Sequence, residues 1–228
     1  PYTNREKIEN LAKKNINIFS LEMLPRITRA QSMDILSSQA NLAGYKAVIE
    51  SFANFEKAIP MMMTAAGTIP AAKVLVVGAG VAGLQAIATA KRMGAIVFAT
   101  DVRMASKEQV ESLGGKFLTV EGSENLETEG GYAKEASDDF KKKQEELLAE
   151  TLKNADVIIQ LGLLSDKNLS NLKENQTLIG VFNPYANKEK IENLAKKNIN
   201  VFSLEMLPRI TRAPVSYTHL TLPTTPYV

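Results

Sequence analysis

The middle of the chain alternates short apolar runs with amphipathic stretches. Strands are predicted at the apolar runs 74–77, 96–100, 117–120 and 157–159, and helices at 82–93, 106–113 and 132–154. This alternation is typical of βαβ units, and therefore of a parallel sheet covered by helices. Beyond it, a helix capped by Ser165 and a strand at 177–182 continue the pattern.

The N-terminal part has a different pattern. Asn4 can cap a helix whose apolar face contains Ile8 and Leu11, and a strand is expected at 17–21. The polar segment 26–34 predicts a loop, and a long helix is expected from Ile35 to about Lys57. Pro60 and Pro70 delimit a connector in which Met61–Met63 are interpreted as core residues.

The two ends of the chain carry one long repeat. Residues 1–30 match residues 184–213 without gaps at 27 of 30 positions, and the differences are Thr3/Ala186, Arg5/Lys188 and Ile18/Val201. Unrelated sequence separates the copies, whereas solenoid repeats are adjacent. The repeat therefore indicates that two versions of one segment were joined.

The C-terminal 15 residues differ from the rest. After Ala213 they contain no Lys, Arg, Asp or Glu, and residues 214–224 resemble the translation of a sequencing adaptor. We interpret residues 214–228 as an artefactual tail, with a disordered Thr/Pro-rich tail as the alternative. The chain starts at Pro1 without a signal-type segment, which favours a fragment over a processed precursor.

Composition excludes several classes of site. The net charge of +2 argues against a nucleic-acid surface, and the absence of cysteine removes disulfides and thiolate chemistry. The single histidine, His219, lies in the C-terminal tail, so neither a histidine mechanism nor a metal site is expected. The longest stretches without charge, 58–72 and 74–90, are too short to span a bilayer.

One motif carries chemistry. Gly78, Gly80 and Gly83 form a G-x-G-x-x-G directly after a predicted strand and at the start of a predicted helix. In that context the first glycine permits a tight turn, the second lets the backbone approach a pyrophosphate, and the third lets helix and strand pack closely. The pattern predicts a Rossmann-like dinucleotide site with phosphate at the helix N-terminus.

An acidic residue follows at the expected distance. Asp101 lies 21 residues after Gly80, at the end of the next predicted strand, where a carboxylate can accept the hydroxyls of the adenosine ribose. This favours NAD over NADP, although Arg103 leaves a case for NADP. The alternative role of Asp101 is to cap the following loop.

Five segments resemble the NAD(H)-binding component of the proton-translocating NAD(P) transhydrogenases. They are PRITRAQSMDILSSQANLAGY, MTAAGTIPAAK, VLVVGAGVAGLQAIATAKRMGA, ATDVR and GGYAKE, and the resemblance covers about residues 1–159. It implies that NAD(H) binds here while NADP(H) binds on a partner component. It also implies a homodimer in the intact protein, attached to the cytoplasmic side of a membrane through membrane-spanning partner components.

The resemblance also assigns residues. Those at the nicotinamide end, which it makes the candidate catalytic group, are Arg26, Gln31 and Asp34, and the same loop contributes Ile27, Thr28 and Ser37 to cofactor binding. Those around the pyrophosphate and adenosine ribose are Gly78, Gly80, Val81, Gly83, Asp101, Val102 and Arg103. A mobile loop closing over NAD would contain Gly131 and Tyr132. None of them would be a proton donor, because hydride passes directly between two nicotinamide rings.

The order of segments departs from the family after residue 160. We expect a partial first α/β domain with the linking helix at 1–57, a truncated dinucleotide-binding domain at 58–160, and a segment duplicating the first domain at 161–213. A fusion near residues 154–159 would explain this order and would deprive the sheet of later strands. The second copy could pair as the missing strand.

Three functions therefore remain open. The first is the NAD(H)-binding part of a transhydrogenase, inactive without its partners. The second is an alanine-dehydrogenase-like NAD oxidoreductase, against which the lack of a credible histidine counts. The third is a non-catalytic NAD-binding fragment.

Overall fold

The computed structural model describes residues 5–19, 27–119 and 138–206. The chain divides into two compact units, residues 1–40 and residues 41–228.

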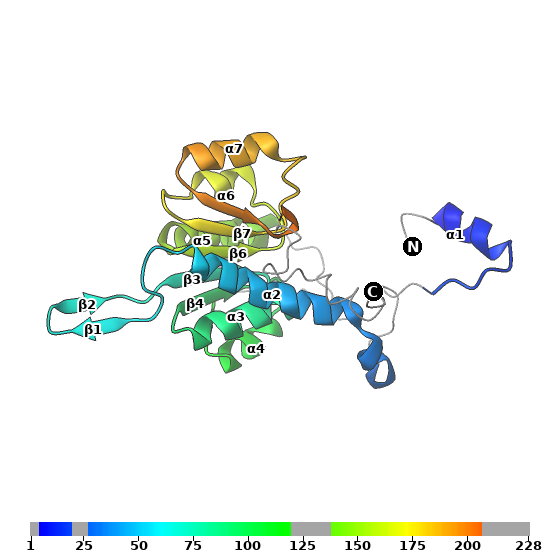
Figure 1. Cartoon of the computed structure of the whole chain (residues 1–228), viewed down its shortest axis with the longest axis horizontal. Coiled ribbons are helices and arrows are strands. Elements are labelled where there is room, and N and C mark those ends of the chain that lie inside the picture. The colour runs from blue at the N-terminus through cyan, green and yellow to red at the C-terminus, as the bar shows by residue number, and fades with distance from the viewer. Residues whose placement is uncertain (1–4, 20–26, 120–137, 207–228) are drawn as a thin grey trace, which may run out of the picture. The chain divides into compact units, whose positions relative to one another are not determined.

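A six-stranded parallel sheet forms the centre of the larger unit (Figure 1). Its strands are β3 (Lys73–Val77), β4 (Ile96–Thr100), β5 (Lys116–Phe117), β6 (Val157–Gln160), β7 (Thr177–Gly180) and β8 (Asn200–Ser203). They are arranged in the order β5-β4-β3-β6-β7-β8, and every neighbouring pair is parallel. This is the doubly wound order of a Rossmann fold, with its switch point between β3 and β6. The predicted α/β class is confirmed.

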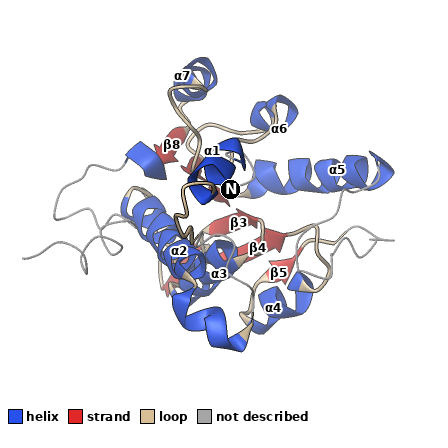
Figure 2. Ribbon diagram, turned by 90° about the vertical axis from the view of Figure 1, so that its right-hand side faces the viewer, coloured by secondary structure: helices blue, strands red, loops and turns tan. Residues whose placement is uncertain are grey.

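Helices cover both faces of this sheet (Figure 2). On one face lie α2 (Ile35–Ala53), α3 (Val81–Arg92) and α4 (Ser106–Ser112), and on the other lie α5 (Asp138–Asn154), α6 (Asp166–Ser170) and α7 (Lys188–Lys196). Of α2, only the part from Asn41 onward belongs to this unit. The helices predicted from the sequence are confirmed over these ranges.

Side-chain alternation in the strands divides the core into two layers. Val74 and Val76 of β3 pack with the α2–α3–α4 layer, whereas Leu75 between them packs with the α5–α6–α7 layer. All three are at most 1% exposed. Because both faces are covered, β3 is apolar at consecutive positions and does not alternate with polar residues.

The connector before β3 forms a hairpin, which the sequence did not predict. Strands β1 (Met62–Thr64) and β2 (Gly67–Ile69) are antiparallel and pair only with each other among the described strands. The expectation that Met61–Met63 are core residues is wrong, since their exposed fractions are 58%, 48% and 71%. Each strand of a hairpin has one sheet neighbour, and none of the described helices packs on this one, so no described element buries its methionines.

The sheet continues across residue 160, where a domain boundary was expected. β7 and β8, from the segment after that residue, pair in register with β6 and with each other. β8 belongs to the second copy of the repeat and occupies the sixth position. The second copy therefore supplies the sixth strand of this sheet.

The smaller unit contains the first copy of the repeat. It forms α1 (Arg5–Ala12), the 3-10 helix η3 (Thr28–Met33) and the first residues of α2. The predicted strand at 17–21 is wrong over the described residues 17–19, which form no strand. Strand structure requires a pairing neighbour, and these residues have none among the described residues of their unit.

Candidate functional site

The glycine motif forms the turn between β3 and α3. Gly78 has φ +101°, a conformation that side chains with a Cβ rarely adopt, and its N–H donates to the carbonyl of Thr100 at 2.8 Å. Val77 and Thr100 are register partners, so Gly78 and Asp101 follow two adjacent strand ends. The turn therefore lies at the carboxyl edge of the sheet, where open α/β proteins bind ligands.

The N-terminus of α3 is open toward this edge. Gly80 is its N-cap, and in the described part of the chain no side-chain hydrogen bond caps the helix there. The first N–H groups of a helix have no intrahelical acceptor, and together they carry partial positive charge. A Cβ placed on Gly80 would meet nothing within 4 Å. Nothing in the described part of the protein therefore requires a glycine at this position, whereas a phosphate at the helix N-terminus would.

At position 83, by contrast, glycine is required by the packing of the protein itself. A Cβ there would lie 1.9 Å from the carbonyl oxygen of Gly78, so only glycine lets the first turn of α3 pack against the loop. Gly44 allows a similar approach of α2 to α3, because its Cβ would lie 2.0 Å from the carbonyl oxygen of Ala82. These contacts hold the open helix end in place.

Asp101 connects the loops that follow β3 and β4 through hydrogen bonds. Its Oδ2 accepts the N–H of Ala79 at 2.7 Å, and its Oδ1 accepts the N–H of Arg103 at 2.8 Å. Its side chain is 7% exposed. Asp101 thus caps the loop that follows β4, the alternative raised from the sequence, and does so directly beside the glycine turn.

Arg103 adds a charged partner to this carboxylate. Its Nε donates to Oδ1 at 3.0 Å, and its Nη2 donates to Oδ2 at 3.2 Å and to the carbonyl of Ala79 at 3.3 Å. Burial acts to raise the pKa of Asp101. The hydrogen bonds from Arg103 and from the backbone of Ala79 and Arg103 outweigh it, and the pKa lies below its ordinary value. The carboxylate is therefore ionised at neutral pH.

Gln160 is a polar residue that the sequence reasoning missed. It ends β6, directly beside Val77 of β3, and so lies at the switch point of the sheet. Its Oε1 is buried and has no hydrogen-bond partner within the described part of the chain. Its position as the one polar residue after three apolar ones in β6 was the available signal.

The nicotinamide-side residues lie in the smaller unit. Asp34 precedes α2 and caps it, since its Oδ1 accepts the N–H of Ser37 at 2.9 Å and its Oδ2 accepts the Ser37 hydroxyl at 2.6 Å. Ile27 is 54% exposed. Thr28 and Gln31 lie in the 3-10 helix η3. The structure thus brings Asp34 and Ser37 together as a helix cap.

The remaining predicted residues divide into two groups. Val81 begins α3 and is 42% exposed, and Val102 lies in the loop between Asp101 and Arg103. Arg26, Gly131 and Tyr132 lie outside the described residues.

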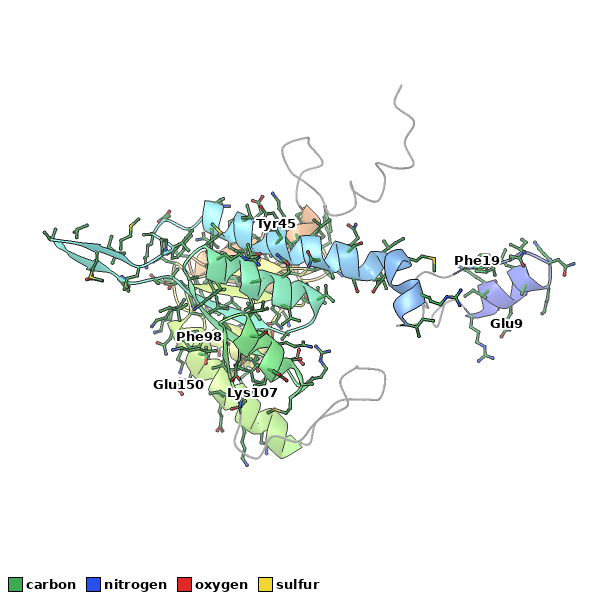
Figure 3. All side chains as sticks on the ribbon, turned by 90° about the horizontal axis from the view of Figure 1, so that it is seen from below. Glu9, Phe19, Tyr45, Phe98, Lys107 and Glu150 are labelled. Atoms are coloured by element: carbon green, nitrogen blue, oxygen red, sulfur yellow. The ribbon has the colours of Figure 1, made fainter. Side chains whose placement is uncertain are left out.

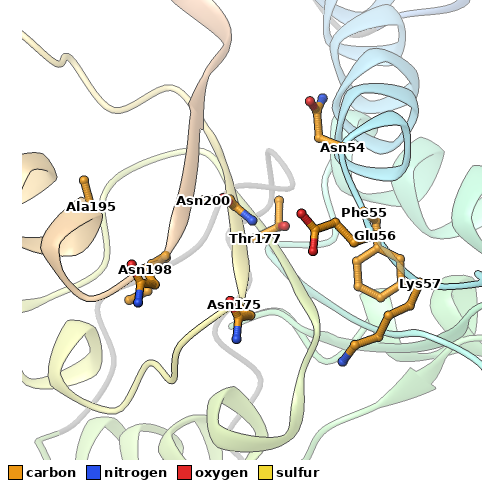
Figure 4. A pocket seen from close by; sticks show the side chains of 10 residues that line it. Asn54, Phe55, Glu56, Lys57, Asn175, Thr177, Ala195, Asn198 and Asn200 are labelled. Atoms are coloured by element: carbon orange, nitrogen blue, oxygen red, sulfur yellow. The ribbon is translucent and has the colours of Figure 1, made fainter.

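A separate polar pocket lies at the opposite edge of the sheet (Figure 4). It has a volume of about 420 Å³ and is lined by residues 54–57, which follow α2, and by residues at the amino ends of β7 and β8, among them Thr177 and Asn200. Parallel strands present their carboxyl ends at the other edge, so this pocket is not part of the glycine site.

Two other kinds of feature are absent from residues 5–19, 27–119 and 138–206. No helix there is both long and apolar enough to cross a membrane. No group of three or more His, Cys, Asp or Glu residues there is placed to hold a metal ion.

Comparison with known proteins bears on this geometry. Residues 47–179 match the model of the alanine dehydrogenase/PNT C-terminal domain, and residues 1–43 match that of the alanine dehydrogenase/PNT N-terminal domain. The chain belongs to the alanine dehydrogenase/PNT family. The resemblance to transhydrogenases noted from the sequence is thereby confirmed at the level of the family.

Individual members of the alanine dehydrogenase/PNT family support the same placement. The first of the parts that make up NAD(P) transhydrogenase subunit alpha in Rhodospirillum rubrum is 60% identical over 167 residues, which is 72% of this chain and 44% of that protein. The protein of the same name from Rickettsia prowazekii is 58% identical over 167 residues, which is 73% of this chain and 44% of that protein. This chain therefore spans less than half the length of these relatives.

A solved structure shows the same architecture. The transhydrogenase from Sinorhizobium meliloti superposes with a TM-score of 0.64 at 45% identity, covering 87% of this chain and 53% of that one. The dipicolinate synthase A chain from Bacillus subtilis, at 14% identity and a TM-score of 0.55, shares only the fold.

Proposed function

We propose that this chain binds NAD(H) at the carboxyl ends of β3 and β4, as the NAD(H)-binding part of an NAD(P) transhydrogenase alpha subunit. The single observation that carries the proposal is the uncapped N-terminus of α3 at Gly80, with the ionised carboxylate of Asp101 hydrogen-bonded to the loop beside it. A dinucleotide needs this pair of features, an anion site for its pyrophosphate and an acceptor for its ribose hydroxyls.

The pyrophosphate would lie against the first turn of α3. The N–H groups of Val81, Ala82 and Gly83 lie in that turn, and the absence of a Cβ at Gly80 gives a phosphate oxygen access to them. No side chain of the described residues would have to move for this contact, because none of them caps the helix.

The ribose contact requires one rearrangement. A carboxylate has about four lone-pair sites, and Asp101 already accepts four N–H groups, three of them from Arg103. A ribose hydroxyl would therefore replace a guanidinium hydrogen bond, and the Arg103 side chain would turn away. Gln160 adds an acceptor at the switch point, suited to an N–H or hydroxyl of the nicotinamide half.

The loop in the smaller unit would orient the nicotinamide ring. We assign this role to Arg26, Ile27, Thr28, Gln31, Asp34 and Ser37, and the closing of the site over NAD to Gly131 and Tyr132. When bound, NADH supplies the hydride, and the protein would position the ring and exclude water. Asp34 would act through the backbone, by fixing the start of α2 beside this loop.

Turnover would require other components. We propose that NADP(H) binds to a separate component, that membrane-spanning partners carry the protons, and that the intact protein is a homodimer on the cytoplasmic side. The relatives' names, which describe an alpha subunit or a portion of one, support a need for further subunits.

Calorimetric titration with NADH and NADPH tests the binding proposal. We expect heat of binding with NADH and a weaker response with NADPH; an absence of heat with NADH would contradict the proposal. Two activity assays then distinguish the reactions. Hydride exchange that appears only after an NADP-binding component is added supports the transhydrogenase, whereas NADH oxidation driven by pyruvate and ammonia supports an alanine dehydrogenase.

A further inference from the structure

The two copies of the repeat fold alike locally. Residues 5–12 and 188–196 are helices, and both helices are followed by an asparagine in the left-handed region, Asn15 at φ 55° and Asn198 at φ 54°. The N–H of Ile16 donates to Leu11, and the N–H of Ile199 donates to Leu194, which is the same bond in each copy. The local sequence therefore determines the helix and its ending in both places.

Their surroundings differ. In the second copy Leu194 and Ile199 are 3% and 4% exposed. Their counterparts in the first copy, Leu11 and Ile16, are 40% and 48% exposed. Phe19, on the stretch that follows α1 (Figure 3), is 88% exposed. The first copy thus displays an apolar face that its duplicate buries.

The second copy shows what this face fits. β8 pairs in parallel with β7, with Leu178 opposite Val201 and Ile179 opposite Phe202. Leu194 and Ile199 pack into the core layer that contains Leu178. The differences between the copies spare these contacts, because Leu194 and Ile199 are unchanged and Val201 differs from Ile18 by one methylene group.

We propose that the edge of β7 is a docking site for a second copy of this chain, whose residues 5–19 take the place of residues 188–202. The chain contains one such edge and two segments that fit it. Within a chain, residues 181–187 join β7 directly to α7 of the second copy, so the second copy pairs with the β7 of its own chain and the first copy has no strand to pair with. Reciprocal exchange between two chains fills both edges with first copies, which is the geometry of a segment-swapped dimer. This inference does not depend on nucleotide binding.

Opening the edge provides the test. In full-length chain, Leu194→Asp with Ile199→Asp places two charges in the buried layer and should release the second copy. Since the chain has no cysteine, Asn17→Cys and Thr177→Cys can report docking. Thr177 is the register partner of Asn200, whose counterpart is Asn17. We expect a disulfide-linked dimer under mild oxidation, and protection from hydrogen exchange at residues 16–19.

Three matched variants control the experiment. Thr177→Cys with Asn200→Cys in the otherwise unchanged chain shows that this register permits a disulfide. Adding Leu11→Asp and Ile16→Asp to the opened chain should abolish both the dimer and the protection. Slow hydrogen exchange in β3 and β4 verifies that the sheet is folded, and the milder pair Leu194→Ala and Ile199→Ala replaces the charged pair if it is not.

Two results would overturn the proposal. One is an opened, folded chain that stays monomeric and leaves residues 16–19 unprotected. The other is a disulfide between residues 17 and 177 that forms only within single chains.

Discussion

Arg103 holds both carboxylate oxygens of Asp101, through Nε at 3.0 Å and Nη2 at 3.2 Å. The two residues are separated by Val102 alone, and the arginine side chain is 22% exposed. Asp101 in turn reaches back to Ala79 in the glycine turn. The pair therefore connects the ends of two adjacent strands at the place proposed for the adenosine ribose.

Removing the carboxylate should weaken binding more than removing the guanidinium. We expect Asp101→Ala to lower the affinity for NADH about ten- to hundredfold, since hydrogen bonds to charged groups contribute about 1.5–3 kcal/mol. Arg103→Ala should leave NADH binding equal or tighter, because it frees the acceptor sites of Asp101. Calorimetric titration of each variant with NADH measures this order.

A control separates charge from position in that experiment. Asp166→Ala also removes a carboxylate, but from an exposed ion pair with Lys190. It should leave the NADH affinity unchanged. Equal losses in Asp101→Ala and Asp166→Ala would contradict a role for Asp101 in the site.

Gly80 and Gly83 of the motif should respond differently to alanine. At Gly80 the new Cβ meets no protein atom, so Gly80→Ala should keep the free energy of unfolding and lose NADH binding. At Gly83 the new Cβ would lie 1.9 Å from a backbone oxygen, so Gly83→Ala should destabilise the fold, by about 1–3 kcal/mol or more. Urea unfolding and NADH titration of both variants give the comparison. If Gly80→Ala binds NADH normally, the phosphate is not at this helix end.

Local signals in the sequence were sufficient for the sheet and the glycine turn. Strands such as β3 are continuous apolar runs, and Gly78 and Gly80 follow directly, so element type and loop chemistry could be read from neighbouring residues. Residues 17–19 could not be predicted in this way. They match residues 200–202 at two of three positions, yet only the latter form a strand, because only they have β7 beside them.

The same limit applies to the candidate site. The spacing of Asp101 from the glycines could be recognised in the sequence. The hydrogen bonds from Arg103 to its carboxylate oxygens could not, because they depend on side-chain packing. Gln160 becomes notable only when β6 is placed beside β3. The exposure of Met61–Met63 depends equally on the absence of a packing neighbour.

Gln176 should be a large contributor to stability outside the site. It is 5% exposed, its Nε2 donates to the carbonyls of Leu152 and Ala155 at 2.6 Å each, and its Oε1 accepts the N–H of Lys173 at 2.6 Å. Gln176→Ala leaves these buried groups without their partner and should cost about 2–4 kcal/mol. Urea unfolding measures the loss, and Asn171→Ala, which loses one solvent-exposed side-chain hydrogen bond to the carbonyl of Lys167, is the control.

The lowered pKa of Asp101 predicts how its contribution to stability depends on pH. Hydrogen bonds from Arg103 and Ala79 hold this pKa below the value of 3.8 that the group has when unperturbed, so the unfolded chain binds the proton more readily than the folded one. The contribution is therefore complete above that value and is lost as the pH falls through it toward the lower native pKa. Asp101→Asn, which cannot titrate, lacks this loss.

We expect the difference in unfolding free energy between wild type and Asp101→Asn to be constant from pH 7 to about pH 5 and to shrink toward pH 3. Glu205, whose pKa is also lowered, is present in both proteins and cancels from the difference. Urea unfolding at each pH measures it, and a difference that stays constant down to pH 3 would show that the Asp101 carboxylate is not stabilised by these bonds.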